Sequence, residues 1–164
     1  MKFLKHLCVA ISVSFFFGSV NAQKWHESNI IFSSDFGVGY ATSFSNDGRT
    51  LAVSNFSKLK KVKVYSEVNG NWVQIGEDVD WGKVVALSGD GSTVAIGNPT
   101  GNTNKQGYVA IYKNVNNEWM KISLNVKFEN DQGTADVKEN DYFGSSIALS
   151  DDGSIVAIGA SQFD

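Results

Sequence analysis

The feature that most limits how this chain can fold is a sequence pattern that occurs three times. Each copy reads Gly, a short apolar run, Ser-x-Asp-Gly, and a second apolar run that contains Ala. The copies span residues 39–53, 82–96 and 144–158, and their turn aspartates lie 43 and then 62 residues apart. Self-similarity at such a period is typical of arrays in which each unit packs only on its neighbours. The sequence therefore predicts a repeat fold.

Local chemistry predicts that each copy is a small antiparallel sheet. Asp-Gly between two apolar runs is a strong hairpin signal, because glycine adopts the positive φ of a tight turn at little cost. The flanking runs are rich in Val, Ile, Tyr and Thr, and no segment after residue 23 has a helical period. We expect four strands in each of the first two copies and two in the third, at 39–45, 50–54, 61–67, 71–76, 83–88, 93–97, 107–113, 118–124, 145–149 and 154–159.

Aromatic residues recur in the second half of the first two copies. Tyr65 and Trp72 are each followed 47 residues later by their counterparts, Tyr112 and Trp119. Residues that recur in register are expected to pack between copies. Trp25 and Trp81 fall outside this register and are freer candidates for surface recognition.

The first 22 residues have the layout of a cleaved signal peptide. Lys2 and Lys5 precede an apolar run over 7–17, and small residues follow, ending Val20-Asn21-Ala22. The run has about eleven residues, fewer than the roughly 20 that span a bilayer, so an uncleaved anchor is the weaker alternative. We predict cleavage after Ala22 and a protein that is secreted or held at the cell surface.

Composition then excludes several kinds of chemistry. The only cysteine, Cys8, lies in the leader, so the exported chain would have no disulfide, thiolate ligand or cysteine nucleophile. With 14 basic and 17 acidic residues the formal net charge is −3, which disfavours a nucleic-acid partner. No stable membrane span is expected after the leader.

The repeat resembles the FG-GAP-like β-propeller repeats of exported bacterial proteins of the Bacteroidetes type. The matching segments are Phe143-Gly144-Ser145-Ser146, Val94-Ala95-Ile96-Gly97, Val62-Lys63-Val64-Tyr65 and Trp72-Val73-Gln74-Ile75-Gly76. The resemblance covers roughly residues 36–164. It implies an all-β fold of propeller-type, four-stranded antiparallel blades, of which this chain would contain about two and a half, an incomplete propeller.

This interpretation divides the chain into six parts. They are a signal peptide (1–22), a lead-in segment (23–38), blade 1 (39–80), blade 2 (81–126), an acidic insert (127–142) and a partial blade 3 (143–164). Closed propellers have four to eight blades, so we expect further blades or self-association, and the chain could also be a piece of a longer protein.

Calcium is the one cofactor that the sequence raises. Ca²⁺ takes six to eight oxygen ligands, and the three Asp-Gly turns offer too few carboxylates, so we interpret them as turns. The acidic insert is the better candidate, and its carboxylates are Glu129, Asp131, Asp136, Glu139 and Asp141. A solvated acidic loop is the interpretation that we prefer there, with no cofactor.

Two further patterns have plain interpretations. Lys58, Lys60, Lys61 and Lys63 form a basic run, which we expect to protect a strand edge rather than bind an anion. His26 is the only histidine after the leader, so no histidine-based triad or metal cluster is expected. No catalytic residue is predicted.

The sequence therefore favours a non-enzymatic, exported repeat protein that binds an extracellular protein or glycan, as in adhesion at the cell surface. The alternative is a fragment of a propeller-based polysaccharide hydrolase or lyase. A cluster of carboxylates along one rim would favour that alternative.

Overall fold

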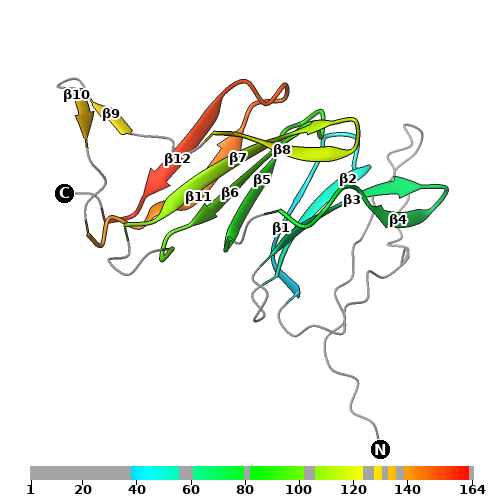
Figure 1. Cartoon of the computed structure of the whole chain (residues 1–164), viewed down its shortest axis with the longest axis horizontal. Coiled ribbons are helices and arrows are strands. Elements are labelled where there is room, and N and C mark those ends of the chain that lie inside the picture. Colours follow the sequence, from blue (N-terminus) through cyan, green and yellow to red (C-terminus); the bar gives the residue numbers. More distant parts are fainter. Residues whose placement is uncertain are drawn as a thin grey trace, which may run out of the picture.

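Antiparallel hairpins make up the regular structure in the described part of the chain, for which we use a computed structural model (Figure 1). The described residues are 38–55, 61–79, 82–101, 106–123, 128–130, 133–135 and 139–162. The predicted leader, Trp25, His26 and Trp81 lie outside these residues. No helix within the described ranges is long and apolar enough to cross a membrane.

The first sheet follows the chain order strand by strand. Its strands are β1 (Val38–Phe44), β2 (Thr50–Asn55), β3 (Val62–Val68) and β4 (Asn71–Gln74), paired in the order β1-β2-β3-β4. Asn69 and Gly70 connect β3 to β4 with φ values of 52° and 81°. Positive φ at both central residues is what a two-residue hairpin with the native twist requires. Short turns thus fix the order of the strands.

The second sheet repeats this arrangement. Its strands are β5 (Val84–Leu87), β6 (Thr93–Asn98), β7 (Tyr108–Val115) and β8 (Glu118–Ser123), paired in the order β5-β6-β7-β8. Asn116 and Asn117 form the tip between β7 and β8, again with positive φ, 55° and 66°. The four-stranded antiparallel unit predicted from the repeat is therefore confirmed twice.

A third sheet has two strands, β11 (Phe143–Leu149) and β12 (Val156–Ala160). Its pairing shifts register between Phe143 and Ser146, as the β1–β2 pairing does between Val38 and Thr42. Gly144 and its counterpart Gly39 both have a φ of 83° at these irregularities. We call the three sheets blade 1, blade 2 and blade 3. The predicted all-β class of partial propeller blades is confirmed.

The acidic insert differs from the loop that the sequence suggested. It contains a short hairpin of β9 (Phe128–Asn130) and β10 (Gly133–Ala135), which pair antiparallel. Strands of three residues are too short for an alternating apolar pattern to reveal them. The hairpin is a separate two-stranded sheet at the end of the described chain opposite to blade 1 (Figure 1).

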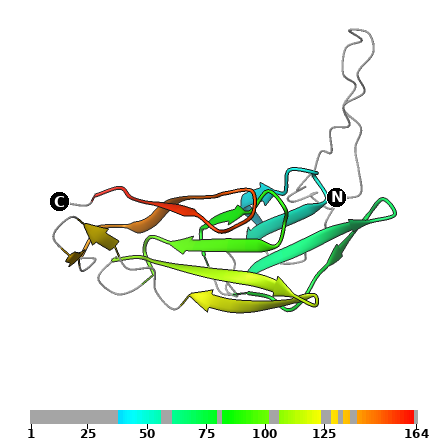
Figure 2. The same ribbon diagram turned by 90° about the horizontal axis from the view of Figure 1, so that it is seen from above.

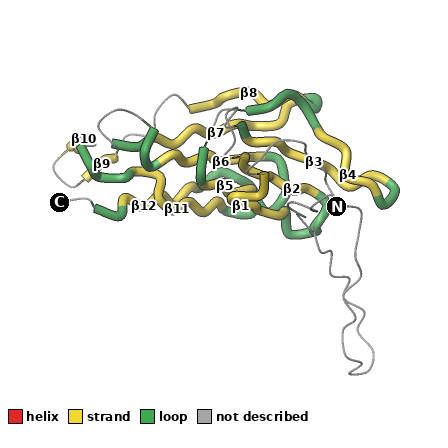
Figure 3. The backbone as a smooth tube through the Cα atoms, turned by 90° about the horizontal axis from the view of Figure 1, so that it is seen from below, coloured by secondary structure: helices red, strands yellow, loops and turns green. Residues whose placement is uncertain are grey.

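The three blades pack side by side, and the first strands of each blade are neighbours. β5 contacts both β1 and β11, and Figure 3 shows these strands adjacent to one another. Seen from above, the β11–β12 hairpin lies along the second sheet (Figure 2). Blade 2 is thus enclosed between its two neighbours.

Residues on β6 alternate between two cores, one on each face of blade 2. Val94 and Ile96 pack into the core shared with blade 1, and Ala95 packs into the core shared with blade 3. All three side chains are fully buried. A strand whose successive side chains point to opposite faces must be apolar throughout when both faces are covered, which explains the Val-Ala-Ile run. Each such aliphatic side chain contributes about 1.5–3 kcal/mol by its burial.

Candidate functional site

The three Ser-x-Asp-Gly turns have the same internal hydrogen bonds. In blade 1, the Ser45 hydroxyl donates to Asp47 Oδ1 at 2.6 Å, and the Arg49 amide donates to the same oxygen at 2.9 Å. The Thr50 amide in turn donates to Ser45 Oγ at 2.9 Å. The same three bonds recur around Asp90 and Asp152 at 2.6–3.0 Å. The turn carboxylates therefore serve as acceptors within their own loops.

These bonds determine how the turn carboxylates titrate. The bond from the Ser45 hydroxyl, followed by that from the Arg49 amide, lowers the pKa of Asp47. Bonds from Ser150 and Ser154 lower the pKa of Asp152 to about 2. Partial burial raises the pKa of Asp90, but the bonds from Ser88 and Ser92 outweigh that effect and the net shift is downward. All three groups are held in the ionised form, because hydrogen bonds to a carboxylate favour its charge.

The turns also join neighbouring blades. The Asn46 amide donates to the Gly89 carbonyl, and the Asp90 amide donates to the Asp151 carbonyl, each at 2.8 Å. A β-carbon added at Gly91 would lie 2.8 Å from Thr50 Oγ1. The turns of successive blades are therefore in direct contact along one rim.

The candidate calcium ligands are only partly described. Asp131 and Asp136 lie outside the described residues, and Glu129 belongs to β9. Glu139 is exposed, whereas Asp141 is buried, with 3% of its surface accessible. Among the described residues, no group of three or more His, Cys, Asp or Glu side chains is placed to hold a metal ion.

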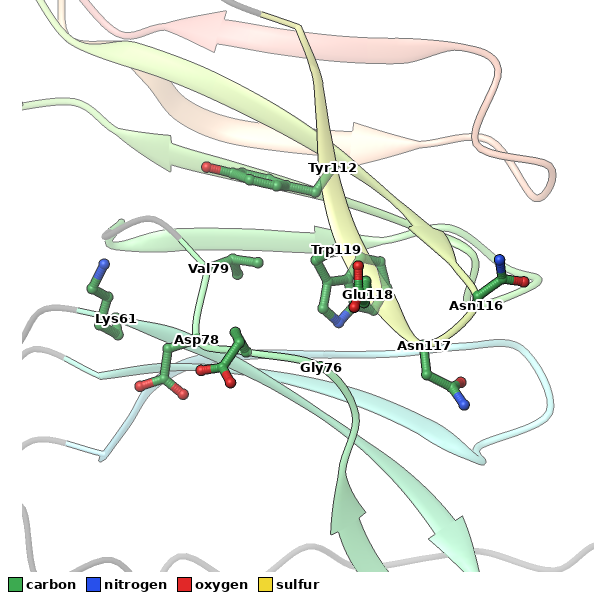
Figure 4. Close-up of a pocket in the computed structure, with 10 residues that line it drawn as sticks. Lys61, Gly76, Asp78, Val79, Tyr112, Asn116, Asn117, Glu118 and Trp119 are labelled. Atoms are coloured by element: carbon green, nitrogen blue, oxygen red, sulfur yellow. The ribbon is translucent and has the colours of Figure 1, made fainter.

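A groove of about 650 Å³ lies between blades 1 and 2 (Figure 4). Its lining residues come from the segment before β3, the segment after β4, and the β7–β8 hairpin: Lys61, Gly76, Glu77, Asp78, Val79, Tyr112, Asn116, Asn117, Glu118 and Trp119. Pockets of about 300–1,000 Å³ accommodate small ligands. Figure 4 shows Lys61 and Asp78 at one end, Asn116 and Asn117 at the other, and Trp119 between them.

Trp119 joins the two walls of the groove. Its indole Nε1 donates to the carbonyl of Ile75 in blade 1 at 3.0 Å. Gly76, with a φ of 69°, lies beneath the ring, where an added β-carbon would be 2.9 Å from Trp119 Cδ1 and from the Asn117 carbonyl. Glycine is needed here for both the backbone conformation and the close approach. The predicted role of Trp119 and Tyr112 in packing between copies is confirmed, since Tyr112 is also buried in the shared core.

Trp72, the counterpart of Trp119, has a different neighbour. Its ring lies 5.8 Å from that of Phe44 within blade 1, at an interplanar angle of 55°. The recurring tryptophan therefore contacts another blade only where the structure describes a preceding blade.

The segment after β4 is fixed by backbone and side-chain bonds. Val79 pairs with Val62 through reciprocal amide-to-carbonyl bonds of 2.9 and 3.4 Å. Asp78 accepts a bond from Gln74 Nε2 at 2.8 Å and lies 3.6 Å from Lys63 Nζ. Lys63 therefore faces a carboxylate rather than solvent alone, which sequence reasoning on the basic run had not identified.

The groove carries more negative than positive charge. Glu77, Asp78 and Glu118 line it, together with one lysine, Lys61. Burial, followed by the charge of Asp78, raises the pKa of the nearby Tyr65 hydroxyl. The site therefore combines carboxylates, amide side chains and aromatic rings in one concave surface. Sequence reasoning missed this groove because its walls come from segments about 40 residues apart.

Comparison with solved structures gives distant similarity to β-propeller proteins. Three examples are the hydrazine synthase of Kuenenia stuttgartiensis (18% identity, TM-score 0.47), a putative 6-phosphogluconolactonase from Bacteroides fragilis (17%, 0.49) and TolB from Acinetobacter baumannii (14%, 0.38). The matches cover 78%, 71% and 81% of this chain, but only 30%, 33% and 41% of those structures. The chain thus spans well under half of each. No protein-family model and no curated protein sequence matches it.

Proposed function

We propose that this chain is part of an exported, FG-GAP-like propeller protein that acts by binding, and that the groove between blades 1 and 2 is its ligand site. The observation that carries this proposal is the composition of the groove. It presents the ring of Trp119, the amides of Asn116 and Asn117, and three carboxylates on one concave surface. Aromatic faces with convergent amide and carboxylate groups suit a ligand with apolar ring faces and many hydroxyl groups.

The charge of the groove narrows the ligand class. Three carboxylates and one lysine would repel a polyanion, and like charges brought together cost binding free energy. We therefore propose a neutral glycan, consistent with a role in adhesion at the cell surface.

A polysaccharide hydrolase or lyase is the second candidate, and one observation favours it. Glu77, Asp78 and Glu118 line the same groove, and a carboxylate pair is what glycoside hydrolysis needs. Release of new reducing or unsaturated ends from a bound polysaccharide would identify this activity.

The test is a glycan-binding screen with neutral and acidic oligosaccharides on the purified protein. Changing Glu77→Gln or Glu118→Gln keeps the shape of the side chain and removes its charge. Each should weaken binding of the best neutral glycan about tenfold, since a hydrogen bond to a charged group contributes about 1.5–3 kcal/mol. Glu139→Gln is the matched control, an exposed glutamate outside the groove that should leave binding unchanged. Preference for acidic glycans, or equal effects of all three variants, would refute the proposal.

A further inference from the structure

The two blade–blade interfaces use equivalent positions. We call the face of a blade that packs on the preceding blade its leading face, and the opposite face its trailing face. In both interfaces an alanine of the trailing face, Ala52 or Ala95, belongs to the shared core. The leading faces contribute the same four positions each time: Val85, Leu87, Val94 and Ile96 in blade 2, and Ile147, Leu149, Val156 and Ile158 in blade 3.

The trailing face of blade 3 has the same character but is uncovered. Ala157 occupies the position of Ala52 and Ala95, which are fully buried, yet Ala157 is exposed. Ala148 and Ser146 beside it are exposed as well. Ile155 is 69% exposed at the position where Thr93 is 1% exposed. This face is therefore a continuation of two established interfaces without an occupant.

The turns show the complementary gap at the other end. A β-carbon added at Gly91 would lie 2.8 Å from Thr50 Oγ1 of the preceding blade, and one added at Gly153 would lie 2.6 Å from Thr93 Cβ. At Gly48, the same position in blade 1, no atom lies within 4 Å of an added β-carbon. Blade 1 thus has the docking turn but no threonine or isoleucine from a preceding blade against it.

We infer that a second copy of this chain docks head to tail, with the turn end of its blade 1 against the trailing face of blade 3. Gly48 and the 38%-exposed Phe44 of one copy would meet Ile155 and Ala157 of the other. Leu51 and Val53 on the same face of blade 1 are already buried, so the contact lies at the turn end. This docking repeats the contacts of Gly91 and Gly153 with their preceding blades.

Head-to-tail docking is compatible with a closed ring. A heterologous interface closes when the rotations of its members add up to a full turn. Each chain supplies three blade positions, so two copies supply six, which lies within the four to eight blades of known propellers. The occupant is thus supplied by the chain itself.

The test is the association state of the purified protein, measured by sedimentation over a wide range of concentrations. Ala157→Lys places a charge on the proposed docking face at an exposed site and should weaken association at least about tenfold, equivalent to about 1.4 kcal/mol. Val73→Lys is the matched control, because Val73 stays 49% exposed in blade 1 although blade 2 is docked beside it. Circular dichroism confirms that both variants fold.

A second variant tests the other half of the interface. Gly48→Asn keeps a residue that tolerates positive φ and fills open space in the single chain, but it would collide with Ile155 in the docked pair. It should weaken association like Ala157→Lys, and mixing the two variants should restore it, because one intact interface remains between unlike copies. A protein that stays monomeric, or association that Val73→Lys weakens as much as Ala157→Lys does, would overturn the inference.

Discussion

Replacing the turn glycines one at a time by alanine separates backbone strain from contact between blades. Gly48 and Gly91 have nearly the same conformation, with φ values of 68° and 72°. An alanine at either site must adopt a left-handed conformation, which costs about 1–2 kcal/mol. Part of that cost is offset because alanine restricts the unfolded chain by about 0.4–1 kcal/mol. Strain alone therefore predicts a loss of about 1 kcal/mol at both sites.

Only Gly91 adds a steric cost. Its new β-carbon would lie 2.8 Å from Oγ1 and 3.0 Å from Cβ of Thr50, whereas the space at Gly48 is open. Inserting a carbon into a packed site costs about 1–3 kcal/mol. Gly91→Ala should therefore destabilise the protein by about 2–4 kcal/mol, which exceeds the effect of Gly48→Ala by about 1–3 kcal/mol.

Urea denaturation followed by tryptophan fluorescence measures this difference between the two variants. The comparison is internally controlled, because both substitutions are chemically identical and occur in equivalent turns. Equal losses of stability, within about 0.5 kcal/mol, would refute the docking of successive turns, since strain alone would then account for both effects.

Four other predictions follow from the same structure. Because the folded pKa of Asp152 is lowered to about 2, its contribution to stability is present above pH 4 and is lost as the pH falls toward 2; Asp152→Asn should flatten the acid part of a stability–pH profile. Trp119→Phe removes the indole bond to the Ile75 carbonyl and should lower the free energy of unfolding by about 1 kcal/mol, measured by urea titration. Excess EDTA and added Ca²⁺ should give the same melting temperature; a large rise with Ca²⁺ would indicate a bound ion. N-terminal sequencing of exported protein should begin at Gln23, and an intact leader would contradict that prediction.

The hairpins of the fold could be predicted because their determinants are local. Asp-Gly and Asn-Gly pairs specify tight turns, and the apolar runs beside them specify strands, so sheet order follows chain order. The Ser-x-Asp-Gly pattern even contains the hydrogen-bond donors and acceptor of its own turn. Residues within about six positions of each other carry all of this information.

The groove and the contacts between blades could not be predicted because they depend on distant residues. Trp119 recurs in register with Trp72, which suggested packing, but nothing local identifies Ile75 and Gly76 as its partners 43–44 residues earlier. The β9–β10 hairpin was missed for a different reason, since strands of three residues leave no periodic pattern. Sequence reasoning therefore found the repeating unit and missed what lies between units.

Amide hydrogen exchange, measured residue by residue, tests most directly whether successive blades dock through their turns. The amides of Asn46 and Asp90 donate to carbonyls of the following blade, Gly89 and Asp151, at 2.8 Å. They should therefore exchange as slowly as the amides of the central strands β2 and β6, although they lie in turns. Exchange of both amides as fast as at the exposed tip of the β7–β8 hairpin would contradict the account.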